Sequence, residues 1–323
     1  MVPPICFVTG ASGFVGRHLV PRLARTFRLR LLLKPGQTIA DAADHERIDG
    51  HLFDLDALAR GCAGAELVVH LAALVSFRRE DRAAMFAVNA QATADLAAAA
   101  SAAGVQRFLH CSTISAVAYR DTPTPVAEDA PFNFGPLRIG YCDSKFAAER
   151  AVLDQCRQGL DAVIVNPPSM YGAGDRRKGD GSLLGAVFAG KVRWAPPGGM
   201  NVANVADVCD GMLAAIARGR RGQRYLLVGE NLTGSELLQR IAAIVGGHAP
   251  RRIVPRPVLA LATHLVRAKE RLFGSKAPLT SEVMALAGKF LFFDGGKAER
   301  ELGWRAGRVD PGIAAAWRDA QSG

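Results

Sequence analysis

Three glycines spaced three residues apart constrain this chain more than any other feature of its sequence. Gly10, Gly13 and Gly16 directly follow the apolar run Ile5–Thr9. They overlap the start of a helix-like stretch, Val15–Thr26. Gly10 permits a tight turn, Gly13 lets a ligand approach the backbone, and Gly16 lets a helix pack closely on a strand. The segment predicts a buried strand, a turn and a helix whose first N–H groups can bind the phosphates of a dinucleotide.

Short apolar runs alternate with helix-like segments through the first two-thirds of the 323 residues. The predicted strands are Ile5–Thr9, Arg28–Leu33, Leu67–Leu71, Arg107–Cys111 and Asp161–Asn166. The predicted helices are Val15–Thr26, Met85–Ala103 and Tyr141–Arg157. Such alternation is typical of a parallel sheet covered on both faces. We therefore expect an α/β protein with a doubly wound parallel sheet, the Rossmann fold, and a smaller C-terminal substrate lobe.

The pattern loosens after Asn166, where Gly, Pro and Arg concentrate. Gln223–Val228 is a further predicted strand, and Thr233-Gly234-Ser235-Glu236 is a capping box that opens a predicted helix over Leu237–Val245. We expect a dinucleotide-binding domain over residues 1–166, completed by about 201–228. Residues 167–200 and 229–323 are expected to form the substrate lobe.

Charge and cysteine content exclude several kinds of protein. The net charge is 40 − 30 = +10, but the basic residues are scattered and accompany no nucleic-acid-reading motif, so no nucleic-acid partner is expected. The six cysteines form no Cys-x-x-Cys pair, which argues against a metal site or a redox dithiol. Reduced thiols and the lack of a recognisable signal peptide predict a cytoplasmic protein.

The motifs and their order resemble the extended short-chain dehydrogenases/reductases, the NAD-dependent epimerase/dehydratase family. The Gly-x-x-Gly-x-x-Gly spacing is typical of short-chain enzymes. Asp54-Leu55 stands where that family binds the adenine, and Leu71-Ala72-Ala73 resembles its loop under the ribose and pyrophosphate. Val88-Asn89 resembles a helix motif whose Asn is a structural tether. Asn201–Asp207, Tyr225–Thr233 and Phe290–Gly303 most resemble dihydroflavonol reductase-like proteins, including bacterial proteins labelled hopanoid-associated sugar epimerases.

The choice of cofactor depends on the residues around and after the second strand. An NAD-selective site places an acidic residue there, but Arg28–Gln37 contains none. The resemblance places Lys34 against the 2′-phosphate of the adenosine ribose, with Arg17 or Arg30 as further candidates. The sequence therefore favours NADP(H) over NAD(H), although Lys34 could also be a solvated loop charge.

Tyr141 and Lys145 are the predicted proton-transfer pair. Residues four apart share one face of a helix, so the two side chains project together. A free phenol has a pKa near 10, and a nearby ammonium favours the phenolate, which suits Tyr141 to general acid–base catalysis. A lone Tyr-x-x-x-Lys is more often a surface pair. Here it follows both the glycine motif and a strand ending at Ser112-Thr113, which supports catalysis.

The family resemblance supplies the remaining site residues. A hydroxyl at the position of Thr113 holds the substrate oxygen, so Thr113, Tyr141 and Lys145 are the predicted catalytic residues. Asn166-Pro167-Pro168-Ser169-Met170-Tyr171-Gly172 resembles a segment beside the nicotinamide. The substrate pocket is expected to include Phe77, Thr113, Tyr141 and Met170. The predicted cofactor site comprises Gly10, Ser12, Gly13, Phe14, Val15, Gly16, Lys34, Asp54, Leu55, Leu71, Ala72, Ala73, Ser112, Tyr141, Lys145, Asn166, Pro167 and Ser169.

These observations predict an NADP(H)-dependent reductase or dehydrogenase that acts on a small, hydrophobic or aromatic carbonyl or alcohol. A nucleotide-sugar epimerase is the alternative, although such enzymes typically carry the acidic ribose ligand that this chain lacks. Dehydratases of the superfamily place an acidic pair after the catalytic Thr, whereas Ile114 and Ser115 stand here. A non-catalytic cofactor-binding regulator is the alternative of another class, but such regulators tend to lose the Tyr or the Lys.

The sequence also supports two hypotheses about assembly. Small residues on the helices Met85–Ala103 and Tyr141–Arg157 predict a homodimer, although they could equally pack on the sheet. They are Ala94, Ala97, Ala98, Ala100, Ala147 and Ala148. Arg251–Lys276 combines an apolar stripe with many cations, which is the pattern of a helix lying on an anionic membrane. Packing of that helix against the substrate lobe is the alternative, and the stripe is too short to span a bilayer.

Overall fold

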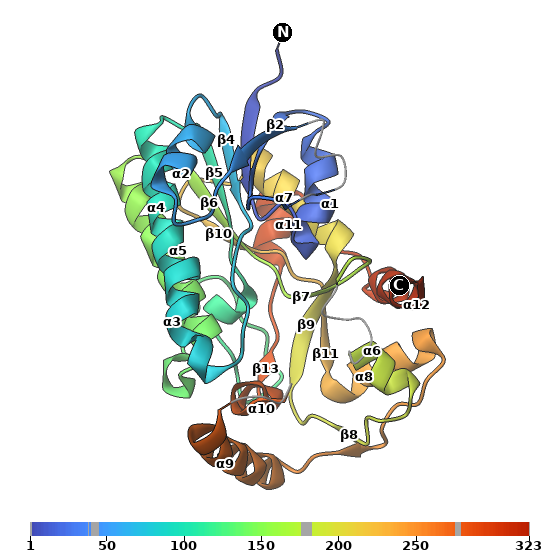
Figure 1. Ribbon diagram of the computed structural model, residues 1–323. Helices are drawn as coiled ribbons and strands as arrows, with labels where there is room; N and C mark the ends of the chain where they lie inside the picture. Colours follow the sequence, from blue (N-terminus) through green and yellow to red (C-terminus); the bar gives the residue numbers. More distant parts are fainter. Residues whose placement is uncertain (1, 38, 40–44, 176–182, 275–278, 323) are drawn as a thin grey trace.

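The main sheet is doubly wound, as predicted. The computed structural model describes residues 2–37, 39, 45–175, 183–274 and 279–322 (Figure 1). Seven parallel strands follow the order β10-β6-β5-β4-β1-β2-β3. They are β1 (Ile5–Thr9), β2 (Arg28–Leu33), β3 (Glu46–Asp49), β4 (Leu67–His70), β5 (Arg107–Cys111), β6 (Ala162–Asn166) and β10 (Arg224–Leu226). The order reverses between β1 and β4, and ligands of such sheets bind at the carboxyl ends of the strands beside that point.

One strand of this sheet was not predicted. β3 is a four-residue edge strand whose sequence, Glu-Arg-Ile-Asp, carries three charges and alternates in exposure. Edge strands of this kind lack the continuous apolar run of a central parallel strand, so hydrophobic patterning does not reveal them. The other predicted strands form at their expected ends or within two residues of them.

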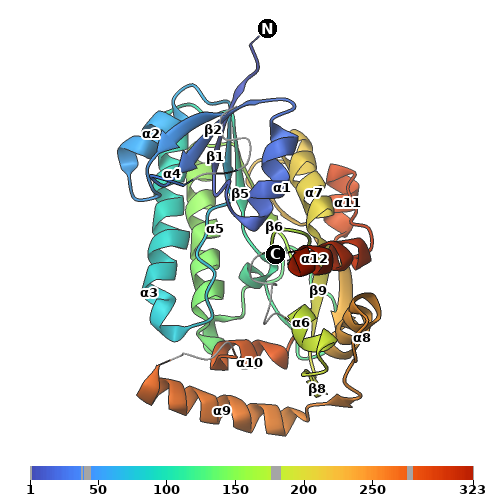
Figure 2. The ribbon, with the colours of Figure 1, turned by 45° about the vertical axis from the view of Figure 1, so that its right-hand side comes forward.

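Helices cover both faces of the sheet (Figures 1 and 2). One face packs against α1 (Phe14–Leu23), α7 (Val205–Arg218) and α11 (Gly296–Leu302) through a core that includes Leu19, Met212 and Trp304. The opposite face packs against α2 (Leu55–Cys62), α4 (Ala92–Ala102) and α5 (Gly140–Gln158) through a core that includes Leu58, Leu96 and Val152.

The single helix predicted over Met85–Ala103 is interrupted. The structure has α3 (Arg82–Met85), a π-helical turn η3 (Phe86–Gln91) and then α4. π-Helical turns are rare and occur frequently at functional sites. Here the turn contains Asn89, whose side chain is fully buried. Short 3-10 turns are η2 (Arg79–Asp81), η4 (Ile114–Ala116) and η5 (Gly135–Leu137).

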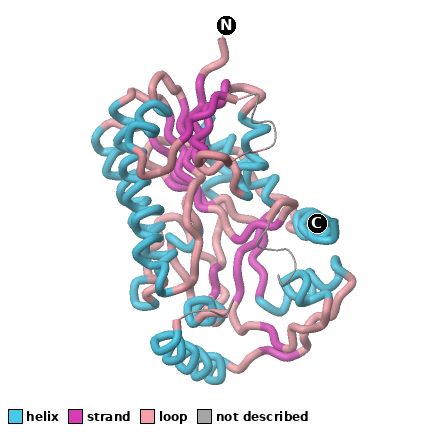
Figure 3. The backbone as a smooth tube through the Cα atoms, in the orientation of Figure 1, coloured by secondary structure: helices cyan, strands magenta, loops and turns pink. Residues whose placement is uncertain are grey.

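A second, smaller sheet forms the centre of the substrate lobe (Figure 3). It pairs β11 (Glu230–Thr233), β9 (Gly199–Asn204) and β13 (Phe290–Leu291), and β7 (Ser169–Tyr171) joins β9. Its core also takes in α6 (Leu183–Phe188), α8 (Gly234–Val245) and α12 (Asp310–Ser322). The predicted capping box is present, since Thr233 and Glu236 bond to each other's backbone N–H groups at the start of α8.

The last part of the lobe lies at its lower end (Figure 1). The two-residue strands β8 (Trp194–Ala195) and β12 (Arg252–Ile253) pair there and lead into α9 (Arg256–Phe273). α10 (Ser281–Ala287) follows and lies between α9 and the rest of the molecule (Figure 2). Lys276, the last residue of the predicted basic amphipathic segment, lies outside the described residues.

The observed elements depart from the expected division of the chain at two places. β9 belongs to the smaller sheet, although its residues 201–204 fall within the 201–228 stretch assigned to the dinucleotide domain. α11 and Trp304 pack on the core of the main sheet, although they fall within the stretch assigned to the lobe. Both departures arise because the chain crosses between the two sheets several times after residue 166.

The alanines behind the predicted dimer divide into two groups. Ala97, Ala100 and Ala148 are fully buried within the chain itself. Ala98 is exposed, and Ala94 and Ala147 are half-buried. Half of the set therefore packs inside the protomer, and the dimer stays a prediction.

Candidate active site

The loops that follow β1 and β4 meet at the carboxyl edge of the main sheet. Thr9 at the end of β1 is in register with His70 at the end of β4, so Gly10 and Leu71-Ala72 lie side by side. Gly10 has a φ of +78°, and a Cβ there would lie 2.5 Å from the backbone nitrogen of Ala72. Only glycine fits this position, because both the dihedral and the contact exclude a side chain.

The second half of the glycine loop forms a cradle suited to a pyrophosphate. A Cβ on Gly16 would lie 2.4 Å from the carbonyl oxygen of Gly10, so α1 packs directly on the turn. Above Gly13, which caps α1, a Cβ would meet only the Gly10 carbonyl oxygen within 4 Å, at 3.2 Å. Phe14, Val15 and Gly16 form the first turn of α1, where backbone N–H groups lack intrahelical partners. The predicted glycine positions therefore fit the pyrophosphate of a dinucleotide.

The loop after β2 is tied to this cradle. Gln37 Nε2 donates to Ser12 Oγ at 2.6 Å, and Arg17 Nε donates to the Ser12 carbonyl at 3.2 Å. Arg47 on β3 donates to the carbonyl oxygens of Lys34 and Gln37, which fixes the loop that presents the exposed Lys34 side chain. Arg47 was missed from the sequence because β3 was not predicted, and Gln37 was missed because a loop glutamine carries no distinctive signal.

The prediction of Arg30 as a further candidate for binding the phosphate is wrong. Its Nε binds Glu46 at 2.8 Å. Its Nη1 donates to the carbonyl oxygens of Arg60, Gly61 and Ala63 at the end of α2. The alternation of side chains along β2 directs Arg30 into the protein beneath α2. Its N–H groups are bonded there to Glu46 and to backbone carbonyls, so they do not bind a phosphate.

Asp54 and Leu55 begin α2, the helix that follows β3. Asp54 caps the helix by accepting a hydrogen bond from the Ala57 N–H at 2.9 Å. Leu55 is 61% exposed. An acidic cap beside an exposed apolar side chain is chemically suited to an adenine ring, which offers an amino group and a flat apolar face.

Asn89 ties the loop after β4 to helix α5. Its side-chain oxygen accepts from Leu74 N–H at 2.7 Å, and its amide donates to the Leu74 carbonyl and to Ser144 Oγ. Ser144 in turn donates to the carbonyl of Tyr141. The family's role for this Asn as a tether is therefore realised, and the π-helical turn places its side chain there.

Lys145 is fully buried and anchored to the end of β5. Its Nζ donates to the Cys111 carbonyl at 2.8 Å and lies 3.5 Å from His110 Nε2. Burial lowers the pKa of Lys145, while Cys111 and Glu149 oppose that shift. The ammonium thus lies at the last residue of β5, the strand that leads into Ser112 and Thr113.

Two buried histidines beside Lys145 stay neutral. Burial, with a smaller contribution from Lys145, lowers the pKa of His70 to about 3, and the same causes lower that of His110 well below its usual value. Thr93 Oγ1 donates to the Asn89 carbonyl, so His70 Nε2 donates to Thr93 and its Nδ1 accepts from Thr9. These rings therefore add polar contacts without adding charge.

Tyr141 and Thr113 are the two predicted catalytic residues that would contact the substrate. Tyr141 is half-buried at the start of α5, and its ring lies edge-on to Phe77, with 5.8 Å between centroids. Thr113 Oγ1 accepts from the Ser115 N–H at 3.2 Å. Both aromatic rings pack against the apolar cluster of Ile114 and Cys142. The structure thus brings Phe77 to Tyr141, as expected for a pocket shared by both.

The segment after β6 also reaches this edge. The Pro167 carbonyl accepts from Ile114 N–H at 3.0 Å, which joins it to the turn after Thr113. Ser169 and Met170 are half-buried on β7, the strand that joins the second sheet. A Cβ on Gly172 would lie 3.5 Å from Phe14, so the loop also approaches the start of α1.

Glu149 and Arg224 are functional candidates that sequence reasoning missed. Glu149 lies one turn beyond Lys145 and is fully buried. Its carboxylate accepts from Asn166 Nδ2 at 2.6 Å and pairs with Arg224. Asn166 also donates to the Thr113 carbonyl at 2.8 Å. Burial raises the pKa of Glu149, and Arg224 opposes that rise most strongly. Glu149 and Asn166 therefore hold the backbone of Thr113 against α5.

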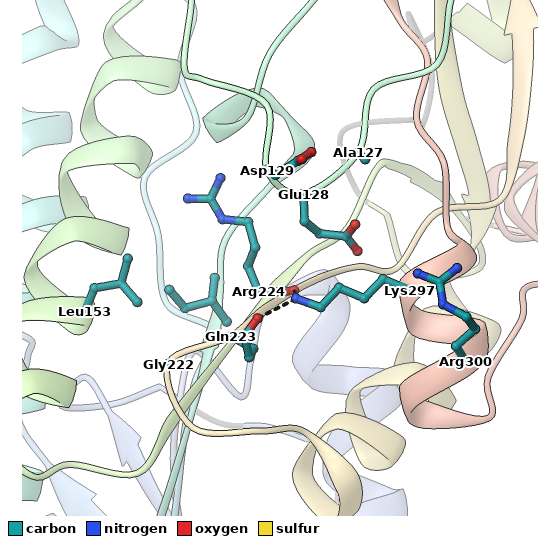
Figure 4. Close-up of a pocket in the computed structure, with 10 residues that line it drawn as sticks. Ala127, Glu128, Asp129, Leu153, Gly222, Gln223, Arg224, Lys297 and Arg300 are labelled. Carbon is teal, nitrogen blue, oxygen red and sulfur yellow. Dashed lines mark hydrogen bonds between the residues drawn. The ribbon is translucent and has the colours of Figure 1, made fainter.

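A cavity of about 370 Å³ lies along the edge strand β10, and Arg224 is one of the residues that line it (Figure 4). Glu128, Arg224, Lys297 and Arg300 line it, and Lys297 donates to Gln223 Oε1. None of the predicted catalytic or cofactor residues lines this cavity. Its polar groups are largely committed to one another and to the backbone, so the carboxyl edge of the sheet is the better candidate site.

Comparison with known proteins identifies the family. Residues 6–228 match the model of the NAD dependent epimerase/dehydratase family. The chain belongs to that family. It is 33% identical to sterol demethylase protein B of Methylococcus capsulatus over 92% of each chain. It is also 32% identical to a 4-hydroxy-2-methyl-3-oxo-4-farnesyl-3,4-dihydroquinoline-1-oxide ketoreductase of Stigmatella aurantiaca, over 94% of this chain and 92% of the other.

A solved structure shows the same fold. A nucleoside-diphosphate-sugar epimerase from Pseudomonas aeruginosa superposes with a TM-score of 0.80 at 27% identity, over 99% of this chain and 98% of the other. The predicted family, fold class and enzyme class are confirmed: the chain is an NAD(P)-dependent oxidoreductase of the short-chain dehydrogenase/reductase superfamily.

Proposed function

We propose that this family member is an NADP(H)-dependent reductase or dehydrogenase acting on a hydrophobic carbonyl or alcohol, with Tyr141 as its general acid and base. The observation that carries the proposal is the position of Lys145, which is buried one helical turn from Tyr141 and bonded to the carbonyl of Cys111, two residues before Thr113. This arrangement sets a proton donor, a cation and a hydroxyl at one strand end.

Each residue has a distinct task in the proposed reaction. The nicotinamide, when bound, supplies or accepts the hydride. Tyr141 Oη gives its proton to the substrate oxygen in reduction and takes it back in oxidation. The Lys145 ammonium stabilises the resulting phenolate. Thr113 Oγ1 already accepts from the Ser115 N–H, so its own proton is available to a substrate oxygen.

An apolar substrate agrees with the residues around Tyr141. The ring of Tyr141 lies edge-on to Phe77, and Met170 is the other predicted apolar contact. The names of the two relatives describe a sterol demethylation protein and a ketoreductase of a farnesylated quinoline, both of which concern large apolar molecules. We therefore favour a polycyclic or aromatic ketone over a polar one.

A nucleotide-sugar epimerase is the second candidate, because a structural relative carries that name. A sugar dehydratase is disfavoured by the residues after Thr113, since Ile114 and Ser115 are buried and neither is a carboxylic acid. A non-catalytic regulator is disfavoured because both Tyr141 and Lys145 are retained in an ordered, bonded arrangement.

The activity is tested by incubating the protein with NADPH or NADH and a panel of apolar ketones and aldehydes, and with UDP- and dTDP-sugars. Oxidation of NADPH with an apolar ketone supports the proposal. Conversion of a nucleotide sugar without net oxidation of added cofactor assigns the epimerase instead. Binding of cofactor without turnover of any compound assigns the regulator.

The preference for NADP(H) rests on Lys34 and is tested separately by calorimetry. A charge-assisted bond to phosphate contributes about 2 kcal/mol, so Lys34→Ala should weaken NADPH binding by roughly thirtyfold and leave NADH binding unchanged. Lys191→Ala, an exposed lysine in the substrate lobe, is the matched control. Equal affinity of the unaltered protein for both cofactors would reject the preference.

A further inference from the structure

Helix α9 turns an apolar face away from the protein. Of its 18 residues only Thr263 is buried, whereas Leu261, Leu265 and Leu272 are 62%, 63% and 76% exposed. The exposed residues Val258, Leu261, Leu265, Ala268 and Leu272 follow spacings of three and four, so they form one continuous stripe. An uncovered stripe of this length is unusual on a monomer and marks an interaction surface.

The stripe is not the face by which α9 packs on the molecule. Leu259, Val266 and Glu270 lie on the opposite side of the helix and are less exposed. Glu270 accepts hydrogen bonds from the N–H and the hydroxyl of Ser281 at the start of α10. α9 runs along the outer side of α10 at the end of the molecule farthest from the N-terminus (Figure 2). The packing that the sequence offered as the alternative therefore exists on one face and leaves the stripe uncovered.

Cations flank the stripe, and acidic groups do not. Lys269 and Arg271 are exposed on its two sides, and Arg251 and Arg252 are exposed just before the helix. The only carboxylate among residues 251–274 is Glu270, which is bonded to Ser281 on the packing side. The strand pair β8–β12 extends the same end of the molecule with Ile253 and Trp194, which are 53% and 45% exposed. Trp residues favour the boundary between lipid and water.

We propose that this docking surface, the stripe Val258, Leu261, Leu265, Ala268 and Leu272 with Lys269 and Arg271, binds the surface of an anionic lipid bilayer. The apolar stripe enters the boundary between headgroups and acyl chains, and the cations contact lipid phosphates. Among the described residues no helix is long and apolar enough to cross a membrane, so the association is peripheral. A second copy of the chain fits less well, because a two-fold contact would bring the same cations together.

The docking surface is one helix away from the candidate active site. Ser281 links α9 to α10, and the carboxylate of Glu282 accepts a hydrogen bond from the backbone of Gly140, the residue before Tyr141. Membrane-bound protein would thus hold its substrate lobe at the bilayer. The docking proposal does not depend on which reaction the site catalyses.

The proposal is tested by co-sedimentation of the full chain with vesicles of phosphatidylcholine, with and without phosphatidylglycerol, at low and high salt. Binding is expected only with phosphatidylglycerol, and salt should weaken it because the cations are exposed. Lys269→Glu/Arg271→Glu should lower the bound-to-free ratio by at least about twentyfold, since each cation near an anionic surface contributes roughly fivefold. Leu261→Ser/Leu265→Ser should reduce it by at least about tenfold.

Matched controls keep the result specific to α9. Arg25→Glu/Arg60→Glu reverses two exposed cations on the dinucleotide-binding domain, and Val2→Ser/Leu183→Ser removes two exposed apolar side chains elsewhere. Both should bind vesicles as the unaltered protein does. Thermal unfolding verifies that every variant is folded. The proposal is overturned if the protein fails to bind phosphatidylglycerol vesicles or if the α9 variants bind normally. It is also overturned if the leucine variant instead abolishes a lipid-independent dimer seen by ultracentrifugation.

Discussion

The two longest helices among the described residues, α5 and α9, differ in which side chains they bury and which they expose. α5 buries eight of its 19 residues, among them the charged Lys145 and Glu149. α9 buries one of its 18 residues and exposes its leucines. Both helices alternate apolar and polar residues, yet the first encloses charges and the second displays hydrophobic side chains.

The difference separates a chemical site from an interaction surface. A buried charge is tolerated only when it is paired or hydrogen-bonded, and on α5 both are: Lys145 to the Cys111 carbonyl, Glu149 to Asn166 and Arg224. These partners all come from the main sheet, so α5 is held in one position against it. The exposed leucines of α9 have no covering partner among the described residues, which leaves them available to an outside surface.

The largest effect is expected at the start of α5. Tyr141→Phe should lower kcat by about 10³-fold, because it deletes the proton donor while leaving the ring in place. Affinity for the cofactor, measured by calorimetry, should change by less than about twofold. Lys145→Ala should impair both catalysis and cofactor binding. The control is Tyr225→Phe, which alters a buried tyrosine outside the site and should leave the rate unchanged. Full activity of Tyr141→Phe on an identified substrate would remove α5 from the mechanism.

Replacing Glu149 tests whether its bonds to Asn166 and Arg224 stabilise the protein. Glu149→Ala leaves Arg224 and Asn166 without their shared partner and should lower the free energy of unfolding by about 3 to 5 kcal/mol. Glu149→Gln can still accept from Asn166 and should recover part of that loss. Denaturation by urea measures both variants. If Glu149→Ala were as stable as the unaltered protein, the bonds to Asn166 and Arg224 would not anchor α5.

Glu282 lies on α10, between the two helices, and its raised pKa predicts a dependence of stability on pH. Burial is the main cause that raises the pKa of Glu282 from 4.5 to about 7. The Gly140 backbone, Arg79 and Arg82 oppose the rise, and Glu270 adds to it. Between these two values the folded protein binds more protons than the unfolded chain, so this group lowers stability as pH rises from about 4.5 to 7.

The replacement Glu282→Gln should remove that component, which is on the order of 2 to 3 kcal/mol. Urea midpoints at several pH values across this range measure it, with Glu66→Gln, an exposed glutamate, as control. If the variant and the unaltered protein lost stability in parallel as pH rises, burial would not raise the pKa of Glu282 in the folded protein.

The smallest effect is expected on the exposed face of α9. Leu265→Ser should change the free energy of unfolding by less than about 0.5 kcal/mol, because the side chain is already in water. Val152→Ala, in the buried face of α5, should lower it by about 2 kcal/mol. A large loss of stability in Leu265→Ser would show that the stripe packs against the protein in solution, and the contrast between the helices would fail.

Local sequence determined much of the fold and the outline of the site. Buried parallel strands require continuous apolar runs, so β1, β2 and β5 were predicted at their observed bounds. Gly10, Gly13 and Gly16 act through the backbone of one short segment, and Thr233 and Glu236 cap a helix from within four residues. Tyr141 and Lys145 share a face because helical spacing alone places them there.

Only the tertiary structure decided which groups from distant segments meet. Arg30 and Lys34 are alike in sequence terms, but β2 directs Arg30 beneath α2 and leaves Lys34 in an exposed loop. Glu149, Asn166 and Arg224 stand up to 75 residues apart and form one network because β6 and β10 are neighbours in the sheet. Whether the stripe of α9 is covered likewise depends on what packs beside it, and periodicity describes a face of a helix without describing its neighbour.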